Sequence, residues 1–203
     1  MTSRSAIRTS RREFGLAMAA LGASACMPVR SVTLPTNLPN RGARQPQLIV
    51  EEVGDFQCPF CAEVQPAVKA LLASHGDRIA LVWRNYPLRR HEFAAAAAEA
   101  ALEVRAQRGD EAFWLYHDVL FQNQFALDLP DLERYAKTIG ADPGRLREAL
   151  KIGVHRSAVE DDLRYVNSLK LPGFGTPAFL IGEDAFIGSY SHRELAEIVE
   201  DKI

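Results

Sequence analysis

Two cysteines stand two residues apart in the segment EEVGDFQCPFCAEVQPAVKALL, residues 51–72. They follow an aliphatic and β-branched run that is typical of a strand, and from Pro59 onward apolar residues recur at helical spacing. Proline is favoured at the first position of a helix, because an N–H there would have no partner. We therefore predict a strand followed by a helix, with Cys58 at the N-cap and Cys61 in the first turn.

This placement favours redox chemistry. A helix N-terminus carries unpaired N–H groups and a partial positive charge, which stabilise an anion. We expect the pKa of Cys58 to fall below that of a free thiol, and Cys61 to be shielded because it turns back along the helix. An exposed nucleophilic thiol with a second thiol in the same turn is the working unit of thiol–disulfide exchange.

Other uses of the pair fit the sequence less well. Structural zinc needs four ligands, but the five histidines are scattered singly and no second C-x-x-C exists. A Cu(I) site with two thiolates is another alternative, and a structural disulfide in so short a ring would remove little entropy from the unfolded chain. We predict no metal and, because no glycine-rich phosphate loop is present, no organic cofactor.

The composition suits one well-packed domain. The chain has 203 residues, of which 47% are hydrophobic and 25% charged. Its formal net charge of -2, with no basic block beyond the first dozen residues, argues against nucleic-acid binding. No apolar run reaches the roughly 20 residues of a membrane-spanning helix.

The N-terminus is typical of an export signal over residues 1–25. Four arginines precede an apolar run, and the small residues of ASAC follow. SRREFGL resembles the twin-arginine motif but departs from it at Gly15 and Leu16, so a Sec signal is an alternative. We predict export to the periplasm or cell envelope, where disulfides persist.

Cleavage before Cys26 would leave this residue at the mature N-terminus. There it is either a free thiol or, if ASAC is a lipobox, a lipid-anchored cysteine; Ala23 stands where a lipobox usually carries leucine. Four prolines among polar residues then predict an extended tether over residues 26–46.

The remaining chain alternates strands and helices. Residues 78–88 are predicted as a second strand, parallel to the first, and helical segments fill about residues 89–170. PAFLIG and DAFIGSY predict a hairpin around Gly182, and Ser191 with Glu194 predicts a capped final helix.

DFQCPFC after the first strand and GTPAFLIG before the hairpin resemble the DsbA-type thiol–disulfide oxidoreductases of the thioredoxin superfamily. The resemblance covers residues 47–203 and includes LRRHEFAAAAAEAA and AFWLYHDVLFQNQ, which look like insertion helices of that family. It implies an α/β thioredoxin-like fold, βαβ then ββα, with a helical insertion between the halves. It also implies an enzyme, a protein disulfide oxidoreductase.

Carried onto this sequence, the resemblance makes Cys58 the attacking cysteine and Cys61 the resolving one. Pro177 would be a cis-proline beside them, and Thr176 would offer its backbone to an extended substrate. Glu52 matches the buried acid of the family and would move protons for Cys61.

Four residues allow more than one interpretation. Glu52 could point to solvent, with Glu51 or neither acid buried. Asp55 is predicted as a turn or capping residue, and His117 as a packed or surface histidine, not a catalyst. Phe60 stands where strongly oxidising relatives carry histidine, so we expect a less oxidising disulfide; the alternatives are an apolar contact for unfolded substrates and plain packing.

The predicted function is donation of the Cys58–Cys61 disulfide to exported proteins through a mixed disulfide at Cys58. The expected partners are unfolded or newly exported proteins that contain cysteine, and a membrane redox partner that recycles the disulfide. A reductase or isomerase and a non-catalytic thioredoxin-like binding protein are the alternatives. The sequence leaves the direction of electron flow, the substrates and the oligomeric state open.

Overall fold

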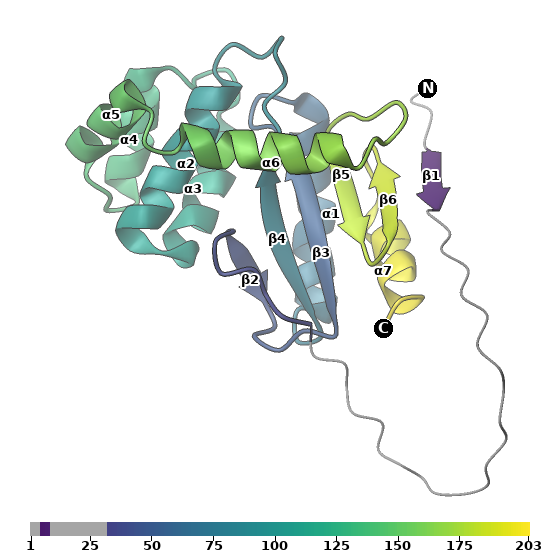
Figure 1. Ribbon diagram of the computed structural model, residues 1–203. Coiled ribbons are helices and arrows are strands. Elements are labelled where there is room, and N and C mark those ends of the chain that lie inside the picture. Colours follow the sequence, from purple (N-terminus) through teal and green to yellow (C-terminus); the bar gives the residue numbers. More distant parts are fainter. Residues whose placement is uncertain (1–4, 9–31) are drawn as a thin grey trace, which may run out of the picture.

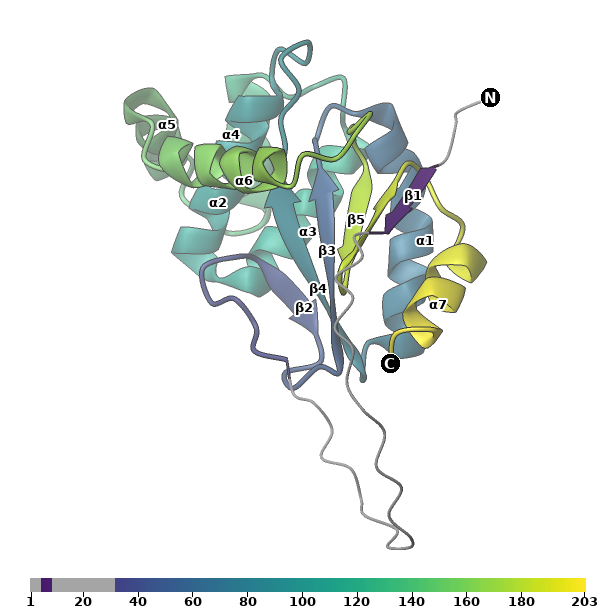
Figure 2. The same cartoon turned by 45° about the vertical axis from the view of Figure 1, so that its right-hand side comes forward.

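The computed structural model describes residues 5–8 and 32–203. The strands are β1 (Ser5–Arg8), β2 (Asn40–Gly42), β3 (Leu48–Gly54), β4 (Ile79–Asn85), β5 (Ala178–Ile181) and β6 (Asp184–Ile187). The helices are α1 (Pro59–His75), α2 (Ala94–Arg108), α3 (Asp110–Gln122), α4 (Leu129–Thr138), α5 (Pro143–Ile152), α6 (Arg156–Ser168) and α7 (His192–Glu200). The strands form one sheet in the order β1-β6-β5-β3-β4-β2, with α6 on one face and α1 on the other (Figures 1 and 2).

The order of elements confirms the predicted thioredoxin-like fold. α1 connects β3 to β4, which pair in parallel, while β5 pairs antiparallel with both β3 and β6. The β5–β6 hairpin turns at Gly182, whose φ of 63° suits glycine, and Ser191 and Glu194 form the predicted capping box of α7. Helices α2 to α6 lie between the two halves of the fold as the predicted insertion.

The segment before β3 differs from the predicted tether at its C-terminal end. β2 pairs antiparallel with β4, the Trp83 amide donates to the Pro39 carbonyl at 3.0 Å, and Leu38 and Pro46 are buried. The ordered domain thus begins before residue 47, because backbone pairing and burial tie this stretch to the sheet.

β1 lies within the predicted export signal and pairs antiparallel with β6, as a sixth strand beside the five of the thioredoxin-like sheet. Cys26 and the predicted cleavage site lie outside the described residues. In the part of the chain that is described, no helix has the length and apolar character needed to cross a membrane.

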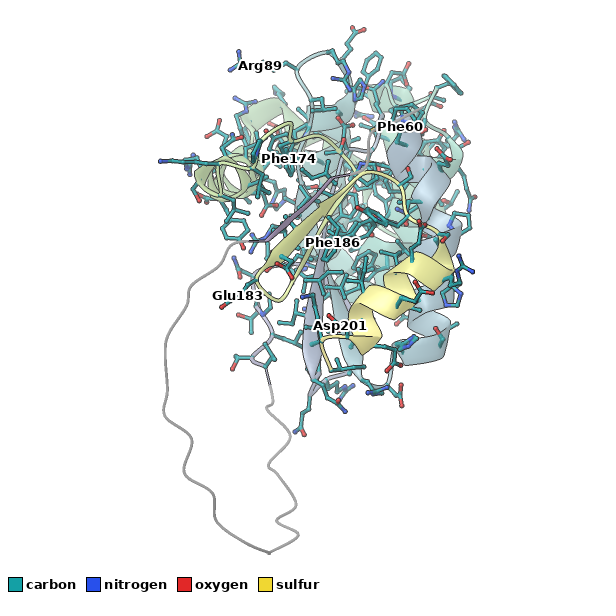
Figure 3. The ribbon with its side chains drawn as sticks, turned by 90° about the vertical axis from the view of Figure 1, so that its right-hand side faces the viewer. Phe60, Arg89, Phe174, Glu183, Phe186 and Asp201 are labelled. Atoms are coloured by element: carbon teal, nitrogen blue, oxygen red, sulfur yellow. The ribbon has the colours of Figure 1, made fainter. Side chains whose placement is uncertain are left out.

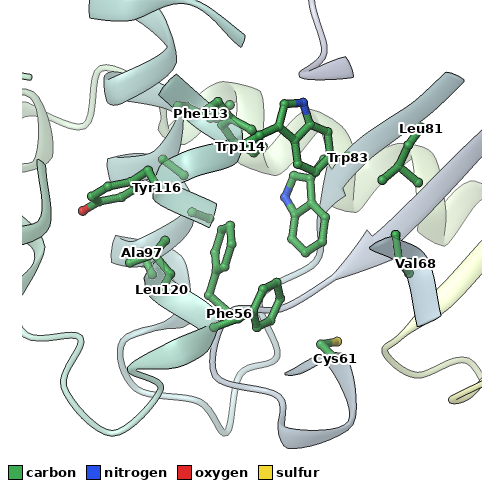
Figure 4. Packing of buried hydrophobic residues seen from close by; sticks show 14 of the residues in the cluster. Phe56, Cys61, Val68, Leu81, Trp83, Ala97, Phe113, Trp114, Tyr116 and Leu120 are labelled. Atoms are coloured by element: carbon green, nitrogen blue, oxygen red, sulfur yellow. The ribbon is translucent and has the colours of Figure 1, made fainter. Parts of the chain in front are cut away.

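The main core lies between the sheet and helices α1, α2 and α3. Figure 4 shows Trp83 from β4 beside Trp114 from α3, with Phe56 between this aromatic group and Cys61. Large side chains buried in this way each contribute about 1.5–3 kcal/mol to stability. A smaller cluster on the other face joins Val53 and Ala178 to Val166 of α6. The core therefore holds β3 and the start of α1 in a fixed relation.

Candidate active site

The loop from β3 to α1 carries both cysteines. Cys58 is the N-cap of α1, with an extended backbone (φ −74°, ψ 119°), and Pro59 is the first helical residue, as predicted. The Cys58 amide donates to the Asp55 carbonyl at 3.1 Å, and the Cys61 amide donates to the Cys58 carbonyl, also at 3.1 Å. The turn thus holds both thiols at the end of α1 where the helix has unpaired N–H groups.

The two thiols have opposite electrostatic surroundings. The pKa of Cys58 is lowered from 9.0 to about 6, chiefly by a hydrogen bond from the Cys61 thiol, and the N–H groups of Cys61 and Phe60 add to this. The pKa of Cys61 is raised, first because burial penalises its thiolate and then because it donates to Cys58. The pair is reduced in this structure, so at neutral pH the thiolate forms on Cys58 and Cys61 keeps its proton.

Cys58 is more covered than the sequence suggested. Only 1% of its surface is exposed, and none of that of Cys61. In its protonated form Cys58 donates to the Thr176 carbonyl at 3.3 Å, and Gln124, after α3, donates to the Cys58 carbonyl at 2.8 Å. The expectation of an exposed nucleophile is therefore wrong. The cis-proline segment lies against the Cys58 thiol and Gln124 against its backbone, so a substrate sulfur must displace the Thr176 contact to reach Cys58.

The Thr176–Pro177 peptide bond is cis, which confirms the cis-proline implied by the family resemblance. β5 begins directly after it, and the Pro177 carbonyl accepts from the Gly188 amide at 2.8 Å. Thr176 itself is 9% exposed. The structure thus brings the cis-proline segment against Cys58, while the binding of substrate to Thr176 stays a prediction.

Glu52 lies on β3, opposite Trp83 of β4, and none of its surface is exposed. Burial raises its pKa from 4.5 to about 7, and a hydrogen bond from Gln65 partly offsets this. Glu51 turns to the other face and forms an ion pair with Arg84. Glu52 is therefore the buried acid, and the alternative that places Glu51 in the core is wrong.

Gln65 links this acid to the cysteine turn. Its Nε2 donates to Glu52 Oε1 at 2.7 Å and to the Cys61 carbonyl at 3.0 Å. The side-chain amide thus fixes Glu52 beneath the first turn of α1. Sequence reasoning missed Gln65, although its position four residues after Cys61 puts both on one face of the helix and was a usable signal.

The Asp55 carboxylate stabilises the loop that precedes Cys58 through hydrogen bonds. Its Oδ1 accepts from the Gln57 amide at 2.7 Å. Its Oδ2 accepts from the Leu88 amide at 2.8 Å and lies 2.7 Å from His91 Nδ1. These bonds confirm Asp55 as a turn residue and tie the loop to the segment after β4.

Apolar surface lies near the cysteine turn. Phe60 is 45% exposed, at the end of the molecule where α1 begins (Figure 3). Phe125 is fully exposed, and its neighbour Gln124 contacts Cys58, which places this loop beside the turn. Gln124 ends the stretch AFWLYHDVLFQNQ, which resembles an insertion helix of the family, but nothing in that stretch indicates that Gln124 or Phe125 lies beside the cysteine turn.

His117 is confirmed as a packed histidine. None of its surface is exposed, and its ring centroid lies 4.8 Å from those of both Trp83 and Phe121. Burial lowers its pKa to about 4. Within the described residues, no three His, Cys, Asp or Glu side chains are gathered closely enough to hold a metal ion.

Comparison with known proteins agrees with this geometry. A family profile described as thioredoxin matches residues 37–201. The chain is also 38% identical over 162 residues to the Na⁺/H⁺ antiporter NhaA 3 of Salinispora tropica, a match that covers 78% of this chain and 24% of the antiporter. The chain therefore spans about a quarter of the length of the curated relatives that it matches.

Solved structures share the fold. The thiol-disulfide exchange protein α-DsbA2 from Wolbachia pipientis has a TM-score of 0.72 at 20% identity, over 82% of this chain and 87% of that one. DsbA2 from Pseudomonas aeruginosa has a TM-score of 0.67 at 26% identity, over 82% and 94%. The chain therefore belongs to the thioredoxin family, shares its fold with DsbA-type proteins, and carries its C-x-x-C pair at Cys58 and Cys61.

Proposed function

We propose that the protein is an oxidase of the cell envelope that donates the Cys58–Cys61 disulfide to newly exported proteins. The asymmetry of the two thiols carries this proposal. Hydrogen bonds at the start of α1 lower the pKa of Cys58 to about 6, while burial keeps Cys61 protonated. A stabilised thiolate is a good leaving group and favours the reduced pair, so the disulfide passes readily to a substrate.

In the proposed reaction, a substrate thiolate attacks Cys58 Sγ, the Cys58–Cys61 bond breaks, and Cys61 leaves as a thiolate. Glu52 gives this thiolate a proton and later recovers one from solvent. A second substrate thiolate then attacks the substrate sulfur of the mixed disulfide, and Cys58 leaves as a thiolate. Two electrons pass from the two substrate thiols to the enzyme pair, and the substrate gains a disulfide.

The proposed substrate is an extended, unfolded chain. Thr176 would offer its backbone beside the cis peptide bond to Pro177, and backbone pairing gives affinity without reading much sequence. The Thr176 carbonyl accepts from the Cys58 thiol in the reduced protein, so the mixed disulfide would release it. The exposed ring of Phe60 adds apolar contact area.

The proposed location and partners rest on the sequence. The predicted signal over residues 1–25 would direct the chain to the periplasm by the twin-arginine or Sec route, and acylation of Cys26 would anchor it. A membrane redox partner would take the electrons from the reduced pair and restore the disulfide. The transport activity of the antiporter relatives is not part of this proposal.

A reductase or isomerase is the second candidate, and Phe60 favours it. The side chain is 45% exposed beside the cysteine turn, and a phenyl ring neither donates a hydrogen bond nor carries charge toward the thiolate. A less stabilised thiolate gives a less oxidising disulfide. The same chemistry would then run in the opposite direction.

Equilibration of the mature protein in glutathione buffers tests the direction. A reduction potential toward about −120 mV, the value of a strong disulfide donor, supports the oxidase, and one toward about −270 mV supports the reductase. Oxidised protein mixed with a reduced unfolded protein should transfer its disulfide. Cys58→Ser should reduce the transfer to the uncatalysed background. In Cys61→Ser, the Cys58 thiolate should attack the disulfide of an oxidised substrate, release one substrate thiolate and accumulate the mixed disulfide, because no second thiol resolves it. If the cysteine pair is neither oxidised nor reduced in any of the glutathione buffers, the protein is a passive binding protein.

A further inference from the structure

β2 brings an arginine to the buried face of the sheet. Arg41 pairs with Leu81 of β4, and Glu52 of β3 pairs with Trp83 of the same strand. Paired residues point to the same face, and residues two apart on a strand share that face. Arg41 and Glu52 therefore lie on one face of the sheet. This is the face of α1 and α3, since Gln65 of α1 binds Glu52 and α3 contacts β2.

The guanidinium of Arg41 lies on an aromatic ring. Its Cζ is 4.1 Å from the centroid of the Trp114 ring, and its buried Nε and Nη2 have no hydrogen-bond acceptor among the described residues. Burial lowers the pKa of Arg41, and the charges of Glu52 and Asp118 oppose this. Burying a cation without saturating its donors is costly, so the position of Arg41 near Glu52 calls for an explanation.

The other ionisable groups around Glu52 come from α1 and α3. Lys69 of α1 forms an ion pair with Asp118 of α3 at 2.8 Å, and Asp118 also lies 3.1 Å from His117 Nδ1. His117 is neutral at neutral pH, and Cys58, Cys61 and Asp55 lie at or just before the start of α1. Tyr116 of α3 donates to the Leu132 carbonyl, and His75 of α1 is paired with Glu200. The positive charge of Arg41 lowers the pKa of Glu52 by more than the negative charge of Asp118 raises it. The neighbouring β4 residue, Trp83, carries no charge.

We propose that Arg41 is a positioning residue for the redox pair, because its charge sets the protonation of Glu52 and thereby the pH range in which Cys61 exchanges its proton. This inference rests on the proton role proposed above for Glu52. When Cys61 leaves as a thiolate and takes the Glu52 proton, a carboxylate forms in the core. The charge of Arg41 stabilises that carboxylate and lets the transfer occur at neutral pH.

Arg41→Met and Arg41→Lys test this role. Methionine removes the charge and keeps an unbranched side chain against Trp114, whereas lysine keeps the charge. The measurement is the rate at which a small thiol reduces the Cys58–Cys61 disulfide across a series of pH values. We expect R41M to move the midpoint of the profile upward by about one pH unit, and R41K to restore most of the wild-type midpoint. Arg44→Met, which removes an exposed cation shortly after β2, is the matched control and should leave the midpoint unchanged.

Glu52→Gln separates this inference from the role of Glu52 itself. If E52Q keeps the wild-type profile, the proton role of Glu52 is wrong. If E52Q abolishes the midpoint of the pH–rate profile but R41M leaves it at the wild-type pH, Glu52 transfers the proton and Arg41 does not influence it. The double variant should match E52Q, and a further shift there would mean that Arg41 acts on the cysteines directly, which overturns the proposal. Thermal unfolding checks each variant, and Arg41→Gln replaces R41M if the latter does not fold.

Discussion

Glu51 and Glu52 are neighbours on β3, yet the two faces of the sheet surround them differently. On the face of α6, Glu51 pairs with Arg84, which also reaches Asp162 at 3.1 Å. Asp162 accepts two more hydrogen bonds, from the amide and the side chain of Asn85, at 3.0 and 3.2 Å. Each charge there has a direct partner, as in polar networks that rigidify a fold.

On the face of α1, the buried acid has fewer partners. Glu52 accepts one hydrogen bond from Gln65, and its Oε2 has no hydrogen-bond partner among the described residues. Arg41 acts on it through space, from its position on Trp114. The difference indicates that the network on the α6 face serves stability, whereas the α1 face leaves Glu52 able to exchange a proton.

Glu52→Gln should have the largest effect on catalysis. The amide keeps the shape of the side chain but cannot exchange a proton, and a positioned acid or base contributes roughly 10²-fold or more to a rate. We expect disulfide transfer to a reduced unfolded protein to slow by about a hundredfold at neutral pH. Glu51→Gln is the matched control on the opposite face, and an equal loss there would contradict the comparison.

The same variant should change how stability depends on pH. Because the pKa of Glu52 rises from 4.5 to about 7 on folding, the native state holds a proton that the unfolded chain loses between these values. Wild-type stability therefore falls as pH rises through this window, by about 3 kcal/mol in total, and E52Q lacks this fall. Urea unfolding at several pH values measures both curves. If the stability of wild type and of E52Q depends on pH in the same way, the pKa of Glu52 is the same in the folded and unfolded states.

Local signals made the redox motif predictable, whereas its surroundings depend on distant contacts. Pro59 after Cys58 fixes the start of α1, whereas the cis bond at Pro177 followed only from the resemblance of GTPAFLIG to the family. Arg41 lies in a stretch that composition predicted as a tether, and it reaches the core only because β2 pairs with β4. The Thr176 carbonyl contacts the Cys58 thiol from 118 residues away, and Gln124 contacts the Cys58 backbone from 66 residues away, so sequence spacing could not reveal how this cysteine is buried.

Asp162→Ala tests the opposite face. It removes the acceptor of Arg84 and of both Asn85 donors, and groups buried without their partner cost about 1–3 kcal/mol. We expect a loss of about 2 kcal/mol in the free energy of unfolding, with no change in the reduction potential of the cysteines. Asp161→Ala, at an adjacent side chain that is 68% exposed, is the control and should change stability little. A shifted potential in D162A would mean that the two faces are coupled.

Phe60→His should have the smallest effect, and it sharpens the comparison at the thiolate itself. The Phe60 backbone N–H already helps to lower the pKa of Cys58, so only the side chain changes. An imidazole can donate a hydrogen bond or carry a positive charge toward the thiolate, which favours the reduced pair and makes the disulfide more oxidising. We expect the potential in glutathione buffers to rise by about 30 mV, equivalent to about 1.4 kcal/mol. Phe60→Leu is the apolar control. If leucine raises the potential as much as histidine does, the gain comes from removing the aromatic ring, and hydrogen bonding or charge at the residue 60 side chain does not control the potential.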